Sequence, residues 1–351
     1  MVSPGHVKHP RFIIAAMGLL SVNMAEILIS HNTEQANREI LREVFSGSGN
    51  VEFLSDVEEA DRAGVIERAE VIITLHTGKE FGAEELGLLK HVRFIQLISA
   101  GAEQLPFLRI PTGAKIASNP GAFAEPMAEH ILAMVLALAK RLCGNQAKMK
   151  QGEFDQKTEN RNLRGLAFGV LGFGGIGQAA ARIMRAVGLS ILAINTSGRT
   201  TEKVDFIGTM DDFEHLLTNS DVLLVSIPLN NRTKGLIGSR ELALMKPDAI
   251  LVNVARGAII DEQSLYRHLF EHPDFSAGID TWWIEPSMGE EFKVNYPFFD
   301  LPNFLGSPHN SSITPGTLDN AIKLAAENAA AFLRGGKIRG EIRREDYVKI
   351  D

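Results

Sequence analysis

Three ionisable side chains follow apolar runs in the second half of the chain, each where a buried strand would end. Arg256 follows AILVNVA, Glu285 lies in DTWWIEP just after GID, and His309 lies in SPHNSS. In an open sheet of parallel strands, ligands bind beyond the carboxyl ends of the strands, so these residues are candidates for one site. Taken singly, each has an ordinary alternative: a surface arginine, a turn glutamate before proline, and a loop histidine.

Together the three side chains form a chemical set. Arg256 can grip a carboxylate with two parallel hydrogen bonds. His309 can move a proton near neutral pH, and Glu285 would orient that histidine and keep it protonated. Beside a nicotinamide, this set is what the reduction of a 2-oxo acid requires.

A glycine-rich turn supplies a candidate dinucleotide site. GVLGFGGIG places Gly172, Gly174 and Gly177 in the GxGxxG spacing, after a strand and before a helix predicted over 178–187. The glycines would allow a tight turn, close approach of a pyrophosphate, and close packing of helix on strand. The helix N-terminus then offers free N–H groups and partial positive charge. The turn predicts dinucleotide binding; another nucleotide-derived cofactor and a purely structural turn are the alternatives.

Beyond that turn the chain reads INTSGRT, at the place where a carboxylate usually holds the adenosine ribose. A carboxylate would repel a 2′-phosphate, whereas Asn195, Thr196, Ser197 and Arg199 can all donate hydrogen bonds to one. We therefore expect NADP(H) to be favoured over NAD(H). The alternative is a simple turn with Arg199 directed to water, which leaves a tolerant or NAD-using site.

Two series of alternating strands and helices must position these groups. From Met24, short β-branched runs such as VIITL and FIQLIS alternate with helical periodicity, which favours a parallel sheet flanked by helices. The second series starts at LAFGVLGFGGIG and closes near FLGSPHNSS. Its strands are almost continuously apolar, as expected when both faces of a sheet are covered.

We therefore predict an α/β fold with two Rossmann-like domains, in which a dinucleotide-binding domain is inserted into a discontinuous, flavodoxin-like substrate domain. The Ala-rich helical segment 314–334 is expected to pack on the first domain. The boundaries are an N-terminal extension of 1–23, a substrate domain of 24–121 and 309–351, and a Rossmann domain of 122–308. Within the extension, Phe12–Leu20 imitates a signal peptide weakly and is too short to span a bilayer.

The composition limits the class of protein. The 351 residues are 45% hydrophobic and 23% charged, which is ordinary for a globular chain of two domains. With 36 basic and 43 acidic residues the net charge is -7, so no broad surface for nucleic acid or anionic lipid is expected. The single cysteine, Cys143, fits a reducing compartment. We expect a cytoplasmic protein with no nucleic-acid partner, no membrane segment and no bound metal.

A long helix rich in Ala, Leu and Met is predicted from Met127 to Leu142, crossing between the domains. It carries more apolar surface than one buried stripe requires. We expect this region to form a homodimer interface; burial within one subunit is the alternative.

An ordered set of motifs resembles a known family. The motifs are LISAGAEQL, MAEHILAMVLALAKR, RGLAFGVLGFGGIG, SDVLLVSIPLNNRTKGLIG, LVNVARGAIIDEQSL, GIDTWWIEP and SPHNSS. From about Met24 onward the chain resembles the D-isomer-specific 2-hydroxyacid dehydrogenases. The SAGA and DTWWIEP forms are similar to a branch labelled phosphoglycerate dehydrogenase-related or glyoxylate/hydroxypyruvate reductase-like. The resemblance implies NAD(P)-dependent hydride transfer to a small 2-oxo acid of the glyoxylate or hydroxypyruvate type, and dimers built through the predicted helix.

The resemblance also implies roles for individual residues. Arg256, Glu285 and His309 fall on the family's catalytic arginine, glutamate and histidine, and Arg256 and His309 would also border the cofactor. Two loops would meet the substrate: Ser99, Ala100 and Gly101, and His76 and Thr77. The remaining cofactor contacts would be the amides of Gly175 and Ile176 for the pyrophosphate, Ile227, Pro228 and Thr233 near the ribose, and Val254, Ala255 and Asp280 at the nicotinamide, with the Asp280 carboxylate accepting from the carboxamide.

Two departures and two rival functions stay open. Formate dehydrogenases, which share the fold, typically have glutamine at the position of Glu285, so this residue argues against that function. Many family members have histidine where this chain has Ser226, so a contact on the adenine or ribose side would differ. A dinucleotide-sensing binding protein, such as a co-repressor of the same fold, can keep all three catalytic residues; the acidic net charge favours the enzyme.

Overall fold

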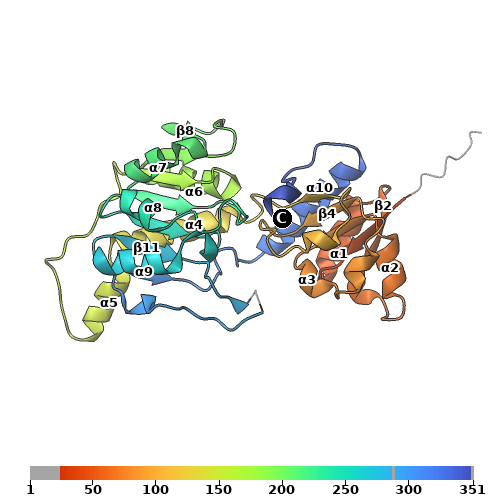
Figure 1. The fold of residues 1–351 in the computed structure, drawn as a ribbon, viewed down its shortest axis with the longest axis horizontal. Coiled ribbons are helices and arrows are strands. Elements are labelled where there is room, and N and C mark those ends of the chain that lie inside the picture. Colours follow the sequence, from red (N-terminus) through yellow and green to blue (C-terminus); the bar gives the residue numbers. More distant parts are fainter. Residues whose placement is uncertain (1–23, 287–288, 349–351) are drawn as a thin grey trace, which may run out of the picture.

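The computed structural model describes residues 24–286 and 289–348, which form two α/β lobes (Figure 1). The extension predicted for residues 1–23 lies outside the described residues. The first lobe contains a five-stranded sheet in the order β2-β1-β3-β4-β5, and the second a seven-stranded sheet in the order β12-β11-β10-β9-β6-β7-β8. All strand pairings in both sheets are parallel. The predicted fold class is confirmed.

The first sheet forms from short β-branched segments that helices cover. Its strands are β1 (Ala25–Ile29), β2 (Gly49–Phe53), β3 (Val71–Thr74), β4 (Phe94–Leu97) and β5 (Lys115–Ala117). Its helices are α1 (Gln35–Val44), α2 (Arg62–Arg68), α3 (Thr77–Glu80) and, from the end of the chain, α10 (Thr317–Leu333). The strand order is the flavodoxin-like one. Buried alanines of α10 pack on this sheet with Ile27 and Phe94, which confirms that the first domain is discontinuous.

The second sheet is covered on both faces. Its strands are β6 (Ala167–Leu171), β7 (Ser190–Ile194), β8 (Phe206–Gly208), β9 (Val222–Val225), β10 (Ile250–Asn253), β11 (Ser276–Ile279) and β12 (Phe304–Gly306). Its helices are α4 (Ala124–Ala139), α5 (Leu142–Lys150), α6 (Gly175–Val187), α7 (Phe213–Asn219), α8 (Ser239–Leu244) and α9 (Glu262–Glu271). Successive strand residues point to opposite faces: Val170 packs with α4 and α6, while Leu171 packs with α7 and α8. This double cover explains the continuous apolar runs.

Two predicted helices differ at their ends. The helix predicted from Met127 to Leu142 is wrong at its end, because Arg141 takes a left-handed backbone conformation with φ of 50° and separates α4 from α5. The helix predicted over 178–187 starts earlier, since α6 begins at Gly175. Within 24–286 and 289–348, no helix is both long and apolar enough to cross a membrane.

The last described residues join the two lobes. Residues Arg344–Asp346 form a single 3-10 turn. The Arg344 guanidinium donates to three carbonyl oxygens of segment 107–111 in the first lobe, at 2.7 to 2.9 Å. The Asp346 carboxylate accepts from Arg232 of the second lobe at 2.8 Å, and its carbonyl accepts from the N–H of Asn231 at 3.0 Å. This segment, which we call the C-terminal tie, adds to the peptide crossings between the lobes.

Candidate active site

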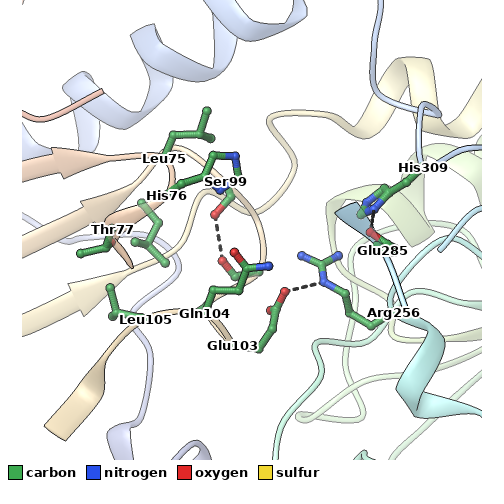
Figure 2. Close-up of a pocket in the computed structure, with 13 residues that line it drawn as sticks. Leu75, His76, Thr77, Ser99, Glu103, Gln104, Leu105, Arg256, Glu285 and His309 are labelled. Atoms are coloured by element: carbon green, nitrogen blue, oxygen red, sulfur yellow. Dashed lines mark hydrogen bonds and ion pairs between the residues drawn. The ribbon is translucent and has the colours of Figure 1, made fainter. Parts of the chain in front are cut away.

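Neighbouring strands bring the predicted catalytic residues together. Arg256 follows β10, Glu285 follows β11 and His309 follows β12, and these strands are paired in that order. From the first lobe, the loops after β3 and β4 carry residues 76–77 and 99–105. The side chains of both lobes line a cavity of about 90 Å³ (Figure 2). The site therefore lies where the carboxyl ends of the two sheets face each other, as expected for parallel α/β folds.

His309 and Glu285 form a close pair. The Nδ1 atom of His309 lies 2.7 Å from Oε2 of Glu285. The other carboxylate oxygen accepts from the N–H of Trp282 at 2.7 Å. The Glu285 side chain is 5% exposed and that of His309 is 36% exposed, so a buried carboxylate holds a ring that reaches the cavity. The Nε2 atom of His309 is left to face a substrate.

The backbone of His309 is strained, and Asp280 holds it. Its φ is 51°, in the left-handed region, which costs a residue other than glycine about 1–2 kcal/mol. The fully buried Asp280 carboxylate accepts from Ser307 Oγ at 2.5 Å and from the N–H groups of Asn310 and Ser311 at 3.2 and 3.3 Å. Asp280 therefore shapes the histidine loop. Its contact with the nicotinamide carboxamide stays a prediction.

The Arg256 guanidinium is held from two sides. Its Nε donates to Oε1 of Glu103, from the first lobe, at 2.5 Å, and its Nη1 donates to the carbonyl of Ala255 at 2.6 Å. A Cβ added to Gly101 would lie 2.2 Å from Nη2, so glycine is needed for the arginine to approach this loop. Figure 2 shows the guanidinium between the loop of residues 99–105 and His309.

The other predicted substrate residues differ in how they meet the cavity. His76, Thr77, Ser99 and Gly101 line it, whereas Ala100 is exposed and does not. The Thr77 hydroxyl lies 3.1 Å from the Thr74 hydroxyl inside the lobe. Ser99 donates from Oγ to the carbonyl of Gly101 at 2.8 Å, which shapes the loop.

The glycine turn has two packed positions and one open one. Gly172 has a φ of 102°, and a Cβ there would meet Ile227 at 2.7 Å; a Cβ on Gly177 would lie 2.5 Å from the carbonyl oxygen of Gly172. Nothing lies within 4 Å of a Cβ on Gly174. Ser226 donates from Oγ to the Gly172 carbonyl at 2.9 Å and so fixes the turn. The open face at Gly174 beside the N-terminus of α6 fits a dinucleotide pyrophosphate.

The remaining predicted cofactor residues lie along the same edge of the sheet. They are Gly175 and Ile176 in the first turn of α6, Ile227 and Pro228 after β9, and Val254 and Ala255 after β10. Thr233 donates from Oγ1 to the Pro228 carbonyl at 2.7 Å and accepts from the N–H of Asn230 at 2.9 Å. It therefore closes the loop that follows β9.

The INTSGRT segment is a hydrogen-bonded turn after β7. Asn195 Oδ1 accepts from the N–H groups of Ser197 and Gly198 at 3.0 and 2.8 Å, and its Nδ2 donates to the carbonyl of Arg199 at 2.9 Å. Asn195 thus holds the turn through Oδ1 and through one of the two hydrogens of Nδ2, and its contact with a phosphate stays a prediction. Thr196, Ser197 and Arg199 are exposed, and the Arg199 guanidinium forms no ion pair with any residue of 24–286 or 289–348.

Both tryptophans pack inside the second lobe, and neither lines the cavity. Trp282 is 3% exposed and donates from Nε1 to the Ser307 carbonyl at 2.8 Å. Trp283 donates to the Ile260 carbonyl at 2.7 Å and stacks on Phe298. A Cβ on Gly257 would lie 2.3 Å from the Trp282 backbone. The glycine after Arg256 therefore allows close packing against the Trp282 backbone.

Comparison with known proteins identifies the family. Residues 132–311 match the family described as D-isomer specific 2-hydroxyacid dehydrogenase, NAD binding domain. The chain belongs to this family. It is 30% identical to the glyoxylate reductase of Thermococcus litoralis, over 81% of this chain and 88% of that enzyme. It is 27% identical to the hydroxypyruvate reductase of Thermotoga maritima, over 74% and 83% of the two chains. The structure of a glyoxylate reductase from Paecilomyes thermophila is 25% identical, with a TM-score of 0.74 over 91% and 98% of the chains.

As a member of the D-isomer-specific 2-hydroxyacid dehydrogenases, the protein is an NAD(P)-dependent oxidoreductase that acts on a CH–OH group. Sequence reasoning missed two residues of its site, Glu103 and Asn253. Asn253 is fully buried at the end of β10; its side chain donates to the Arg256 carbonyl at 2.9 Å and accepts from the N–H of Ala255 at 3.0 Å. A polar residue ending an apolar run was the available signal, because buried polar groups need partners.

Proposed function

We propose that this dehydrogenase reduces small 2-oxo acids of the glyoxylate or hydroxypyruvate type, with NADP(H) preferred over NAD(H). The convergence of the His309–Glu285 pair and Arg256 on one small cavity supports the proposal. Relatives named glyoxylate reductase and hydroxypyruvate reductase support the same substrate class.

The residues divide the chemistry among themselves. Arg256 and the loop of residues 99–101 hold the substrate carboxylate, since a guanidinium and backbone N–H groups are strong donors to an anion. Nε2 of His309 donates a proton to the carbonyl oxygen as the bond order of the carbonyl falls. Glu285, 2.7 Å from Nδ1, stabilises the protonated ring before that step. When bound, a nicotinamide cofactor would supply the hydride that the carbonyl carbon accepts.

The direct test is the oxidation of NADPH and NADH, followed by absorbance, with glyoxylate, hydroxypyruvate, pyruvate and phenylpyruvate. We expect turnover with the small acids. Silence across the series together with tight cofactor binding would instead favour a dinucleotide-sensing protein of the same fold.

The cofactor preference is proposed to depend on Arg199. This exposed cation lies after β7 without an ion-pair partner in the described ranges, and a 2′-phosphate would accept its hydrogen bonds. Arg199→Ala is expected to lower kcat/KM for NADPH about tenfold or more and to leave that for NADH unchanged, since a charge-assisted hydrogen bond is worth about 1.5–3 kcal/mol. Steady-state kinetics with both cofactors measure this.

Arg267→Ala is the matched control, because this arginine is exposed on α9, away from the cofactor residues. A wild-type preference for NADH, or an unchanged NADPH preference in Arg199→Ala, would contradict the assignment.

The homodimer is proposed to form through α4, α5 and the segment that follows. About half of α4 is buried within the subunit, but α5 buries none of its residues. Leu142, Met149 and Phe154 are 56%, 62% and 74% exposed, and apolar side chains gathered on an extended arm favour a protein interface. Light scattering is expected to give twice the 38.4 kDa subunit mass for wild type and a shift to monomer in Phe154→Asp.

Phe270→Asp is the control for the dimer, since Phe270 is 68% exposed on α9. A 38.4 kDa species for wild type at micromolar concentration would refute the dimer.

A further inference from the structure

Glu103 reaches from the first lobe into the second and lines the cavity beside Arg256. Its Oε1 accepts from Arg256 Nε at 2.5 Å. Its Oε2 is buried and has no hydrogen-bond partner in the part of the chain that the structure describes. A buried carboxylate oxygen without a donor is costly, so a ligand that donates to it gains affinity.

The unpartnered oxygen lies at the substrate loop. A Cβ added to Gly101 would lie 2.6 Å from Oε2 of Glu103 and 2.2 Å from Nη2 of Arg256, so both atoms lie over the same glycine. An acid held by Arg256 and this loop would therefore be next to the Glu103 carboxylate. Glu103 also acts on Tyr347, whose pKa is raised to about 12. The largest cause is burial of the phenol, and the negative charges of Glu103 and Asp346 contribute.

The charges that line the cavity balance when His309 carries the proton that the proposed mechanism requires. Arg256 is paired with Glu103, and a protonated His309 is paired with Glu285. His76, which also lines the cavity, adds a positive charge only when protonated. The carboxylate of a substrate can share the Arg256 guanidinium with Glu103. A second anionic group on the same substrate would lie at short range from the carboxylates of Glu103 and Glu285. Repulsion of this kind is strong in a partly desolvated site.

We propose that Glu103 determines substrate specificity: it favours 2-oxo acids that carry one negative charge and a hydrogen-bond donor on C3, and it rejects those with a second anionic group. The preferred class is then a 3-hydroxy-2-oxo acid, and its phosphate ester is excluded. This inference rests on the proposed reduction of 2-oxo acids.

Hydroxypyruvate and its 3-phosphate test the proposal because they share a carbon skeleton. The readout is the ratio of kcat/KM for the hydroxy acid to that for the phosphate ester. Glu103→Gln keeps the size of the side chain and removes its charge, so this ratio is expected to fall at least about tenfold, or about 1.4 kcal/mol. Glu103→Asp keeps the charge and should keep the ratio near the wild-type value. Glu84→Gln, at an exposed glutamate, should leave it unchanged.

An equal ratio in wild type and Glu103→Gln would overturn the proposal, even if both KM values rise together, because a merely structural role moves both substrates alike. If Glu103→Gln does not fold, wild type decides: kcat/KM for oxaloacetate, which carries a carboxylate on C3, is expected to be at least about tenfold below that for hydroxypyruvate. Equal values would overturn the proposal. No turnover of any 2-oxo acid by wild type would instead overturn the proposed function, and this inference with it.

Discussion

Replacing His309 with alanine is expected to lower kcat for 2-oxo acid reduction by about 10² to 10⁴, the usual contribution of a general acid. In the proposed mechanism the ring donates the proton to the carbonyl oxygen, and its Nδ1 lies 2.7 Å from a carboxylate that is 5% exposed. The proposed pyrophosphate site at Gly174 and α6 follows β6, whereas His309 follows β12, so cofactor affinity should stay close to wild type.

Steady-state kinetics and a cofactor titration followed by fluorescence measure the two effects separately. His91→Ala, at an exposed histidine of the first lobe, is the control and should be unaffected in both. Near-normal kcat in His309→Ala would remove His309 from the proposed mechanism.

Arg256→Lys is expected to lower kcat/KM for every 2-oxo acid by about 100-fold or more. The guanidinium binds Glu103 through Nε and the Ala255 carbonyl through Nη1, and still presents Nη2 over Gly101. An ammonium group has one nitrogen and cannot keep these contacts while it grips a carboxylate. Loss of one or two charge-assisted hydrogen bonds at about 1.5–3 kcal/mol each accounts for the size of the effect.

Most of that loss should fall on KM for the acid, because in the proposed mechanism Arg256 would hold the carboxylate in the ground state and in the transition state alike. KM for the cofactor should change little. Arg267→Lys provides the matched control on α9. An unchanged KM for all tested acids would show that Arg256 does not hold the substrate carboxylate.

The strand ends could be predicted from the sequence because each one combines an apolar run with a polar residue directly after it. The rule that parallel strands end at the same edge was enough to place Arg256, Glu285 and His309 together. The strands β10, β11 and β12 are indeed adjacent. The strands β5 and β8 were missed, since segments of three residues carry almost no periodicity.

The contacts that join distant segments could not be predicted in this way. Glu103 and Arg256 are 153 positions apart, and nothing local to either side chain indicates the other. Asn195 was predicted as a phosphate ligand because its amide donor is visible in the sequence, but the bond from this amide to the Arg199 carbonyl depends on the shape of the turn. The end of α4 at Arg141 likewise lacks the glycine or proline that usually marks a helix end.

The C-terminal tie has a mechanical consequence for the two lobes. The chain passes between the lobes twice, and the Glu103–Arg256 ion pair also joins them. The tie adds a further attachment, which opposes any rotation that moves residues 230–232 away from residues 344–346. In its ion pair, the Arg232 side chain is 64% exposed, so the pair is worth about 0–1 kcal/mol. The bond from the Asn231 N–H to the Asp346 carbonyl adds about 0.5–1.5 kcal/mol. An attachment of this strength opens and re-forms at room temperature. The tie therefore restrains lobe rotation weakly and reversibly. A substrate held between Arg256 and the loop of residues 99–101 would add the stronger restraint.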